Sequence, residues 1–238
     1  MEKIKRLTKL FIQEDIDGYL IPKNDGHFGE YINDNEDRLQ YFTQFSGSFG
    51  LALVLKEKNY LFVDGRYTLQ ANIQSGKLYK IKTIPKENPK TVLRKKKLKI
   101  GFDPKLFTKK TLEFFFKKTD CMLVPIQENL IDKIWQRKKK GKIFKFYRLP
   151  YKATDKKVKL KIKDVIFEMK KKGADFKFIS SSENNAWLFN IRGHDSGYTP
   201  LPNCYALIDI KKKIYFFCDL KRISLSFKNK FRNIVFLD

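Results

Sequence analysis

The sequence has no long apolar segment and few cysteines, and each shortage excludes a class of protein. No apolar run approaches the ~20 residues of a membrane-spanning helix, and the N-terminus alternates charged with apolar residues, unlike a signal peptide. Cys121, Cys204 and Cys218 lie far apart and form no CxxC pair, which argues against a disulfide framework or a zinc site. We therefore expect a soluble protein of the reducing cytoplasm.

Metal-ligating side chains are also scarce. His27 and His194 are the only histidines, and neither has a metal-ligand constellation around it. A lone histidine in a polar loop usually makes ordinary surface hydrogen bonds. We predict that this chain holds no metal ion and no other cofactor.

Positive charge is what the chain has in excess, with 51 Lys and Arg against 26 Asp and Glu. Strongly basic chains often neutralise nucleic-acid phosphates. Here lysine greatly outnumbers arginine, and the lysines are scattered over nearly every polar segment. The densest clusters, at 94–99 and 137–142, coincide with expected loops or linkers. We interpret the charge as a solvated surface and keep nucleic-acid binding as an alternative.

The apolar pattern of the first half predicts an α/β fold. Helical spacing over residues 4–11 precedes a short apolar strand at 18–22. Leu51–Leu55 and Tyr60–Val63 are separated by four residues and predict an antiparallel hairpin, and a helix is expected to begin near Arg66. Later expected elements are a strand at 99–102, a helix capped by Thr108 and a strand at 122–125.

The second half repeats this plan. A helical face over 158–169, with Gly173 as its stop signal, precedes a strand at 176–179. A second hairpin follows, in which Tyr215–Asp219 resembles a segment 155 residues earlier, Tyr60–Asp64. The runs Leu53–Leu55 and Ile208–Ile210 keep the same offset. We therefore predict a duplicated α/β domain with a boundary near 137–142.

Three groups of residues carry a resemblance to a known family. The first is DGHFGEYI at 25–32, followed by Arg38 and by FTQFSGSFG at 42–50. The second is VDGRY at 63–67, followed by Gln70 and Ala71. The third is AWLFNIRG at 186–193, preceded by ENLIDKIW at 128–135. In this order and spacing they resemble the first two domains of the three-domain Xaa-Pro aminopeptidases, or aminopeptidase P, of the creatinase and prolidase superfamily.

The motifs also have physical explanations of their own. The glycines of 46–50 permit a positive φ or a close backbone approach, and the serines of the same segment can bond freed amides. A phosphate-cradling loop is the alternative there, although no GxxxxGK pattern is present. Asp64 is placed to cap the helix that follows it.

Four residues are candidates for contact with a substrate or a partner subunit: Arg66, His27, Arg192 and Asp195. Arg66 can bind a carboxylate through a bidentate pair, or its turn can be purely structural. Arg192 and Asp195 can instead pair or bond loop carbonyls. No catalytic residue is predicted.

The resemblance implies two tandem creatinase-type domains, 1–137 and 143–238, each a mixed β-sheet flanked by helices. It places the chemistry in a C-terminal "pita-bread" domain, where carboxylates and a histidine hold two metal ions, usually manganese, that act on Xaa-Pro peptides. No part of this sequence resembles that domain. We therefore interpret the chain as a non-catalytic N-terminal part, inactive alone, whose partner is a second copy or the missing metal-binding domain. The alternative is a scaffold or chaperone-like relative.

Some positions depart from the family pattern, among them Gln44, Phe49 and the loop 198–202. Relatives continue beyond the position of Asp238, so we expect the second domain to be incomplete. An incomplete sheet leaves an unpaired edge and uncovered apolar side chains. We expect this exposure at Ile234, Val235 and Phe236.

Overall fold

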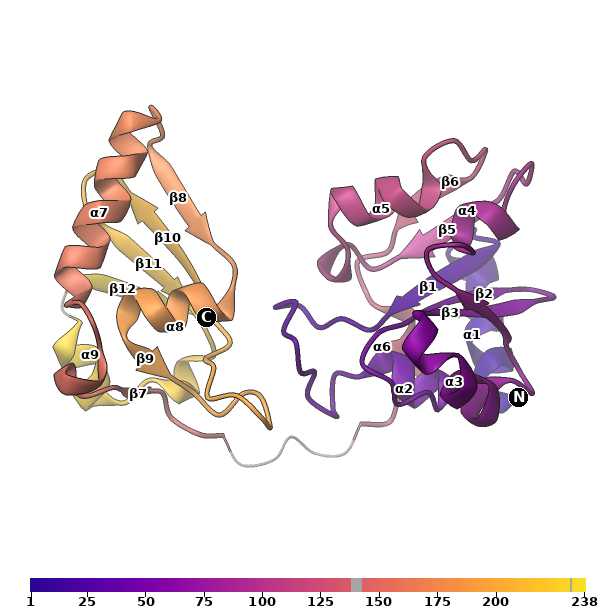
Figure 1. Ribbon diagram of the computed structural model, residues 1–238, viewed down its shortest axis with the longest axis horizontal. Helices are drawn as coiled ribbons and strands as arrows, with labels where there is room; N and C mark the ends of the chain where they lie inside the picture. Colours follow the sequence, from indigo (N-terminus) through magenta and orange to yellow (C-terminus); the bar gives the residue numbers. More distant parts are fainter. Residues whose placement is uncertain (138–142, 232) are drawn as a thin grey trace. The chain divides into compact units, whose positions relative to one another are not determined.

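A computed structural model describes residues 1–137, 143–231 and 233–238, which form two compact units (Figure 1). The first comprises Met1–Gly26 and Asp34–Lys138, and the second His27–Asn33 and Lys139–Asp238. The segment His27–Asn33 thus belongs to the second unit, although the residues on either side of it belong to the first. The expected boundary at 137–142 falls almost wholly outside the described residues.

The first unit is built on a mixed six-stranded sheet in the order β4-β3-β2-β1-β5-β6. β1, β2 and β3 pair antiparallel, whereas β4, β5 and β6 run parallel to their neighbours. The strands are Gly18–Pro22 (β1), Leu51–Leu55 (β2), Asn59–Val63 (β3), Lys80–Thr83 (β4), Lys99–Phe102 (β5) and Met122–Pro125 (β6). The helices are Glu2–Gln13 (α1), Arg38–Thr43 (α2), Thr68–Ser75 (α3), Pro89–Val92 (α4), Lys109–Phe116 (α5) and Leu130–Ile134 (α6), with short 3-10 helices at Gly65–Tyr67 (η1) and Pro104–Leu106 (η2).

Both faces of this sheet are covered. On one face Tyr19 and Leu61 belong to a core to which α1, α2, α3 and α6 contribute. On the other face Leu20, Leu53 and Phe62 belong to a core that includes residues from η2 and α5. Every residue of β1 and β2 is consequently buried, as expected for strands with helices on both sides.

The second unit contains a four-stranded sheet in the order β12-β11-β10-β8. Its strands are Phe176–Ile179 (β8), Tyr205–Asp209 (β10), Ile214–Phe217 (β11) and Ile234–Leu237 (β12), and a separate pair joins Tyr147–Arg148 (β7) to Ile191–Arg192 (β9). Its helices are Val158–Lys171 (α7), Ser182–Phe189 (α8) and Leu225–Lys230 (α9), with 3-10 helices at Tyr151–Ala153 (η3) and Leu220–Arg222 (η4).

The two units repeat one topology. Apart from β9, which lies between α8 and β10, the order α7-β8-α8-β10-β11-η4-α9-β12 matches α1-β1-α2-β2-β3-η1-α3-β4, and the strand pairings have the same directions. The helices α2 and α8 both end at a left-handed residue, Gln44 with φ 68° and Asn190 with φ 52°. Asp64 and Asp219 each accept a backbone N–H two residues on, which starts η1 and η4. The predicted duplication is confirmed.

The predicted alignment is wrong along one strand. Leu207 pairs with Tyr215, as Leu53 pairs with Tyr60, so Leu53 corresponds to Leu207 and not to Ile208. Asn59, predicted to lie in the four-residue loop of the first hairpin, already belongs to β3. The turn of the second hairpin is therefore one residue longer than the turn of the first. Along β3 and β11 the predicted offset holds.

One face of the second sheet carries the core of that unit, and the other does not. Residues on β10 and β11 alternate between buried and half-buried, and those on β12 between half-buried and exposed. Ile234 and Phe236 pack against the core, so their predicted exposure is wrong. The prediction holds for Val235, which is 39% exposed together with Leu237 at 36%. Among the described residues, no helix is long and apolar enough to cross a membrane.

Candidate functional site

Arg66 lies on the surface of the first unit, in the turn between the hairpin and α3. Its guanidinium donates to the Asp64 carboxylate, with Nη2 2.6 Å from Oδ2. The Asp64 carboxylate also accepts the Arg66 N–H at 2.9 Å and thereby caps η1, as predicted. The Arg66 guanidinium lowers the pKa of Asp64, and Asp64 raises the pKa of Arg66. The Arg66 side chain is 73% exposed, so it remains accessible to an external carboxylate.

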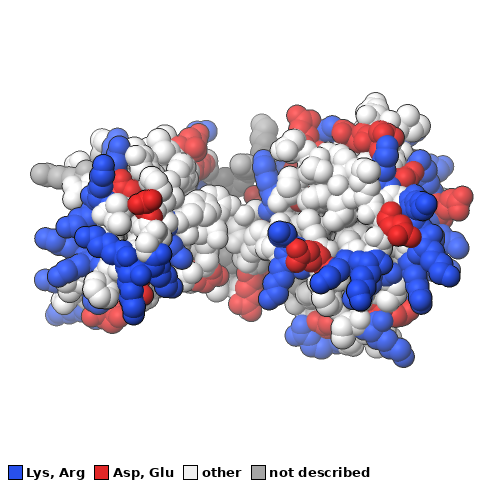
Figure 2. Space-filling view, turned by 90° about the horizontal axis from the view of Figure 1, so that it is seen from above, with Lys and Arg blue, Asp and Glu red and all other residues white. Residues whose placement is uncertain are grey.

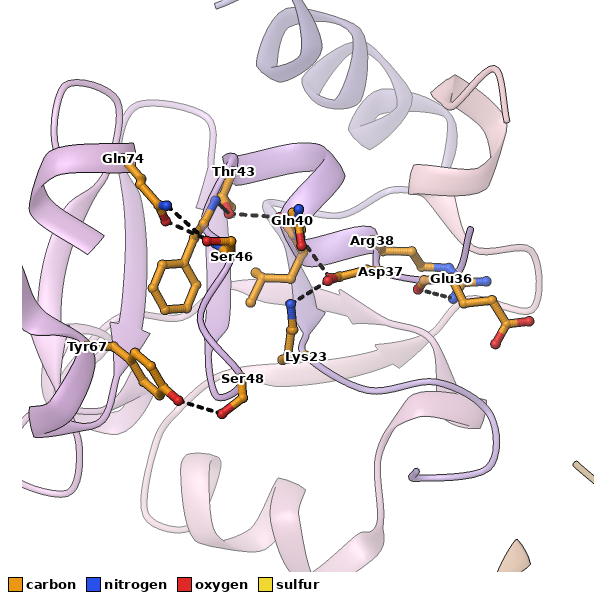
Figure 3. A network of polar contacts seen from close by, with 12 residues as sticks. Lys23, Glu36, Asp37, Arg38, Gln40, Thr43, Ser46, Ser48, Tyr67 and Gln74 are labelled. Carbon is orange, nitrogen blue, oxygen red and sulfur yellow. Dashed lines mark hydrogen bonds and ion pairs between the residues drawn. The ribbon is translucent and has the colours of Figure 1, made fainter. Parts of the chain in front are cut away.

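The loop before β2 is held by side chains of the elements that follow the hairpin (Figure 3). Ser46 Oγ accepts from the side-chain amides of Gln70 and Gln74, both at 2.9 Å. Ser48 Oγ lies 2.6 Å from Tyr67 Oη. The two serines therefore bond side chains of α3 and η1, and the prediction that they bond freed amides is wrong.

The predicted close approach at this loop is present. A Cβ atom on Gly50 would lie 2.9 Å from Leu39 Cδ2, inside the contact distance of two carbon atoms. The positive φ is found at Gln44, the residue that ends α2. Two features thus shape the loop before β2: it packs onto α2, and it follows the left-handed residue Gln44.

A second polar group fixes α2 (Figure 3). Asp37 accepts the Gln40 N–H at 2.9 Å and forms an ion pair with Lys23 in which both side chains are largely buried. Arg38 binds Asp132 of α6 through two bonds, Nε–Oδ1 at 2.8 Å and Nη2–Oδ2 at 2.9 Å. Paired bonds of this geometry are strong and directional. The charged side chains of these two ion pairs therefore stabilise the fold of the first unit.

Asp195 is the principal buried carboxylate of the second unit, at 6% exposure. It accepts the Asn203 N–H at 2.7 Å and forms an ion pair with Arg222 of η4. Burial raises the pKa of Asp195, while the Asn203 amide, Arg222 and the nearby His27 and His194 act in the opposite direction. Asp195 therefore fastens its loop to the turn after the second hairpin.

His27 and Arg192 have structural partners in the same unit. The His27 ring stacks on Tyr205, with centroids 4.7 Å apart and an interplanar angle of 22°. Arg192 Nη1 donates to the carbonyl oxygens of Ala186 at 3.2 Å and Ile191 at 2.8 Å, and the first of these lies within α8. Arg192 thus bonds carbonyls, but those of α8 and β9 and not the predicted loop carbonyls.

The second unit thus contains three of the four predicted residues, and the first unit contains Arg66. The electrostatic influence of His27 on Asp195 links two of the three. Sequence reasoning missed Arg222, the ionic partner of Asp195. The internal repeat gave no signal for it, because the position that matches Arg66 is Lys221, and Arg222 matches Tyr67.

The chemical repertoire of the described residues is narrow. The described ranges contain no group of three or more His, Cys, Asp or Glu side chains that can hold a metal ion, so they do not fit a dinuclear centre. Burial raises the pKa of Cys204 well above its usual value and that of Cys218 to about 12, so both are thiols at neutral pH. The accessible Arg66 guanidinium can bind an anion, and the rest of the polar network is structural.

Comparison with known proteins decides the family. Two profiles, both described as the Creatinase/Prolidase N-terminal domain, match residues 3–134 and 137–236. The chain belongs to the creatinase/prolidase superfamily. Its two matched regions correspond to the two repeated units, and the predicted fold of two tandem domains of this type is confirmed.

Within this superfamily the chain is similar to aminopeptidase P. It is 30% identical over 222 residues to "Aminopeptidase P1" of Lotus japonicus, covering 90% of this chain and 33% of that protein. It is 34% identical over 217 residues to "Probable Xaa-Pro aminopeptidase P" of Neosartorya fischeri, covering 87% and 33%. The chain therefore spans about a third of the length of these curated relatives.

A solved structure is similar to almost the entire chain. The X-prolyl aminopeptidase of Caenorhabditis elegans, described as a cytosolic enzyme with a di-nuclear active site, matches with a TM-score of 0.91 and 26% identity. The match covers 99% of this chain and 42% of that enzyme. In sequence and fold the chain is thus similar to the N-terminal part of an aminopeptidase P.

Proposed function

We propose that this chain is the non-catalytic part of a cytoplasmic, proline-specific metalloaminopeptidase. Joined by a C-terminal metal-binding domain, it removes the N-terminal residue that precedes proline. The observation that carries the proposal is the match of 99% of the chain to an X-prolyl aminopeptidase of which it covers only 42%. Two metal ions, manganese in this proposal, belong to the remaining part of such an enzyme.

In this proposal the chain shapes the substrate site and the assembly. Arg66 is the strongest candidate of the four predicted residues, because its guanidinium is exposed while Arg192 and Asp195 are engaged in internal bonds. A guanidinium already aligned by Asp64 is suited to bind a peptide carboxylate or an acidic side chain of a second copy. We propose that Arg66 contacts substrate or the partner subunit of a homodimer.

The distribution of charge does not favour the nucleic-acid alternative. On the face drawn in Figure 2, Lys and Arg are spread over both units and are interrupted by Asp and Glu. A nucleic-acid-binding surface instead concentrates its positive charge in one patch or stripe. The aminopeptidase similarity likewise favours a peptidase over a scaffold.

Reconstitution tests the proposal. The full chain is mixed with the part of the C. elegans enzyme beyond its matched 42% and with Mn(II), and cleavage of Arg-Pro-Pro is followed. We expect cleavage by the mixture and none by the chain alone. Turnover or stoichiometric Mn(II) binding by the chain alone would contradict the proposal.

An arginine pair tests the role of Arg66 in the same mixture. We expect Arg66→Ala to lower kcat/KM by about tenfold, the usual scale for a lost charged hydrogen bond. Arg94→Ala removes another exposed arginine of the first unit and should change nothing. Equal effects of the two substitutions would remove Arg66 from the site.

A further inference from the structure

Two cysteines lie at the open end of the second hairpin, and the proposed function involves neither of them. β10 and β11 pair antiparallel, with Tyr205 opposite Phe217. Continuing this register by one residue places Cys204 opposite Cys218. Residues that directly oppose each other on antiparallel strands point their side chains to the same face of the sheet. The two thiols are therefore neighbours across the hairpin.

The burial of the two cysteines agrees with this placement. Ala206 of β10 and Phe216 of β11 are the next residues on the same face, and both are buried in the core of the second unit. Cys204 and Cys218 belong to the same core, at 1% and 9% exposure. The two groups also interact electrostatically, because Cys218 contributes to the raised pKa of Cys204. Register, burial and electrostatics thus place the same two side chains together.

The type of pair that they form suits a disulfide. The Cys218 N–H donates to the Leu237 carbonyl of β12 at 3.0 Å, so it points away from β10. Cys204 and Cys218 therefore form a non-hydrogen-bonded pair, in which opposing Cα atoms lie about 4.5 Å apart. Disulfides join Cα atoms that are about 4.4–6.8 Å apart. Both cysteines are free thiols in the structure, and a bond between them requires little movement of the backbone.

The first unit has no such pair. The matching positions there are Gly50 and Val63, which lie one residue beyond the paired Leu51 and Phe62. The shared topology therefore does not require cysteines at the end of this hairpin. The pair is a property of the second unit alone, and the first hairpin is a natural control for it.

Polar contacts already fasten the same end of the second hairpin. Asp195 accepts the Asn203 N–H at 2.7 Å and forms an ion pair with Arg222. Asn203 directly precedes Cys204, and Arg222 lies in η4, the turn that follows Cys218. A bond between the two cysteines would therefore join covalently the two segments that Asp195 holds through polar contacts.

We propose that Cys204 and Cys218 form a redox-active dithiol, which a small-molecule disulfide converts to a cross-strand disulfide. The thiolate of Cys218, the more exposed of the two, attacks one sulfur of the oxidant, and one small thiol leaves. The Cys204 sulfur then attacks the Cys218 sulfur of this mixed disulfide, and a second small thiol leaves. Two electrons pass to the oxidant, whose S–S bond is reduced, and the protons of the two cysteines end on the released thiols.

Burial makes this reaction slow and dependent on pH. It raises the pKa of Cys204 well above its usual value and that of Cys218 to about 12. Because the thiolate is the attacking species, its small fraction limits the rate at neutral pH. Disulfides of cytosolic proteins, where they occur, are usually transient bonds of this redox-sensing kind. The pair therefore responds to a sustained excess of oxidant.

Mapping of the thiols in the full chain tests the pairing. The chain is incubated with excess glutathione disulfide at about pH 8.5, where more thiolate is present, and is then unfolded and alkylated. Peptide mapping should show one bond between Cys204 and Cys218, with Cys121 alkylated or joined to glutathione. Cys121→Ala is the matched control and should form the same bond. Cys204→Ala should leave Cys218 free or joined to glutathione.

Three outcomes of this mapping would each overturn the proposal. The first is alkylation of both Cys204 and Cys218 in the unsubstituted chain. The second is a lasting glutathione adduct on either of them, and the third is a bond from either of them to Cys121.

Hydrogen exchange measures the consequence of the bond without any substitution. Oxidation should slow the exchange of the Tyr205 and Phe217 amides by at least about tenfold, because a cross-link beside them opposes local opening of the hairpin. The matching amides of Leu51 and Phe62 in the first unit should be unchanged. Unchanged exchange in the second hairpin, or equal slowing in both hairpins, would overturn the placement of the bond.

Discussion

The two sheets have the same topology and differ in what covers them. β1 and β2 are buried at every position, whereas β10 and β11 alternate between buried and half-buried positions. Yet Tyr205–Asp209 and Ile214–Phe217 read as nearly continuous apolar runs, which is the pattern of strands covered on both faces. The strands of the second sheet therefore have the composition of strands covered on both faces, although only one face carries the core of that unit.

A phenylalanine at equivalent positions in the two sheets gives the largest contrast. Phe62 of β3 is fully buried in the first unit. Phe217, which occupies the matching position of β11 and pairs with Tyr205, is half-buried. Phe62→Ala should lower the free energy of unfolding of the first unit by about 3–5 kcal/mol, because it opens a cavity. Phe217→Ala should cost the second unit about 1–2 kcal/mol, because a half-buried side chain loses less buried apolar area when it is removed. Urea unfolding measures both, and equal losses would show that the two sheets do not differ in burial at this position.

An aspartate pair directly before β1 and β8 gives a smaller contrast. Asp17 accepts the Lys99 N–H of β5 at 2.9 Å, and Asp175 stands at the matching position of a unit whose described residues include no such strand. Asp17→Ala should cost about 1–2 kcal/mol through the lost bond. Asp175→Ala should change stability by less than about 0.5 kcal/mol. Thermal unfolding of the two variants in parallel measures both losses, and a larger loss for Asp175→Ala would contradict the expected difference between the two units.

The same aspartate gives a pH prediction. The Lys99 backbone N–H is the main cause that lowers the pKa of Asp17. An acid with a lowered folded pKa stabilises the folded state above its unfolded pKa, and this contribution is lost as pH falls through the folded pKa. Wild-type chain and Asp17→Ala should therefore converge in stability under acidic conditions. A constant difference at all pH values would show that the charge of Asp17 is irrelevant.

Asp195 should show the smallest effect and the opposite sign. Burial raises its pKa, so the folded second unit takes up the proton more readily than the unfolded chain. The stability contributed by this group therefore rises as pH falls from neutral through the raised pKa. Asp195→Asn keeps an acceptor for Asn203 and should flatten this pH dependence of unfolding. An unchanged slope would contradict the assigned direction.

Much of the fold could be predicted from the sequence, because apolar runs and caps act locally. Gly18–Pro22 and Leu51–Leu55 form strands with the predicted bounds, and Thr108 and Asp64 cap their helices as expected. The repeat was visible because Tyr60–Asp64 and its counterpart keep both their pattern and their cap.

The errors arise where the outcome depends on distant contacts. Ile234 is half-buried and Val235 is exposed because the helices cover only the side of the sheet that carries Ile234. The short apolar run does not encode which side is covered. Asp195 pairs with Arg222, which lies 27 positions later in the chain, and the sequence alone is equally compatible with a pair between Asp195 and Arg192. The loop His27–Asn33 belongs to the second unit through contacts such as His27 with Tyr205, for which its sequence gives no signal.

Hydrogen exchange of the full chain compares the covered and uncovered sheets most directly. The amides of β1 have hydrogen-bonded strands on both sides, whereas β8 has β10 on one side within the described residues. We predict that the β8 amides bonded to β10 exchange at least about 100-fold faster than the β1 amides bonded to β2, because less buried apolar surface opposes local opening. Equal protection of the two strands would contradict the account that the second sheet repeats the first with one face and one edge uncovered.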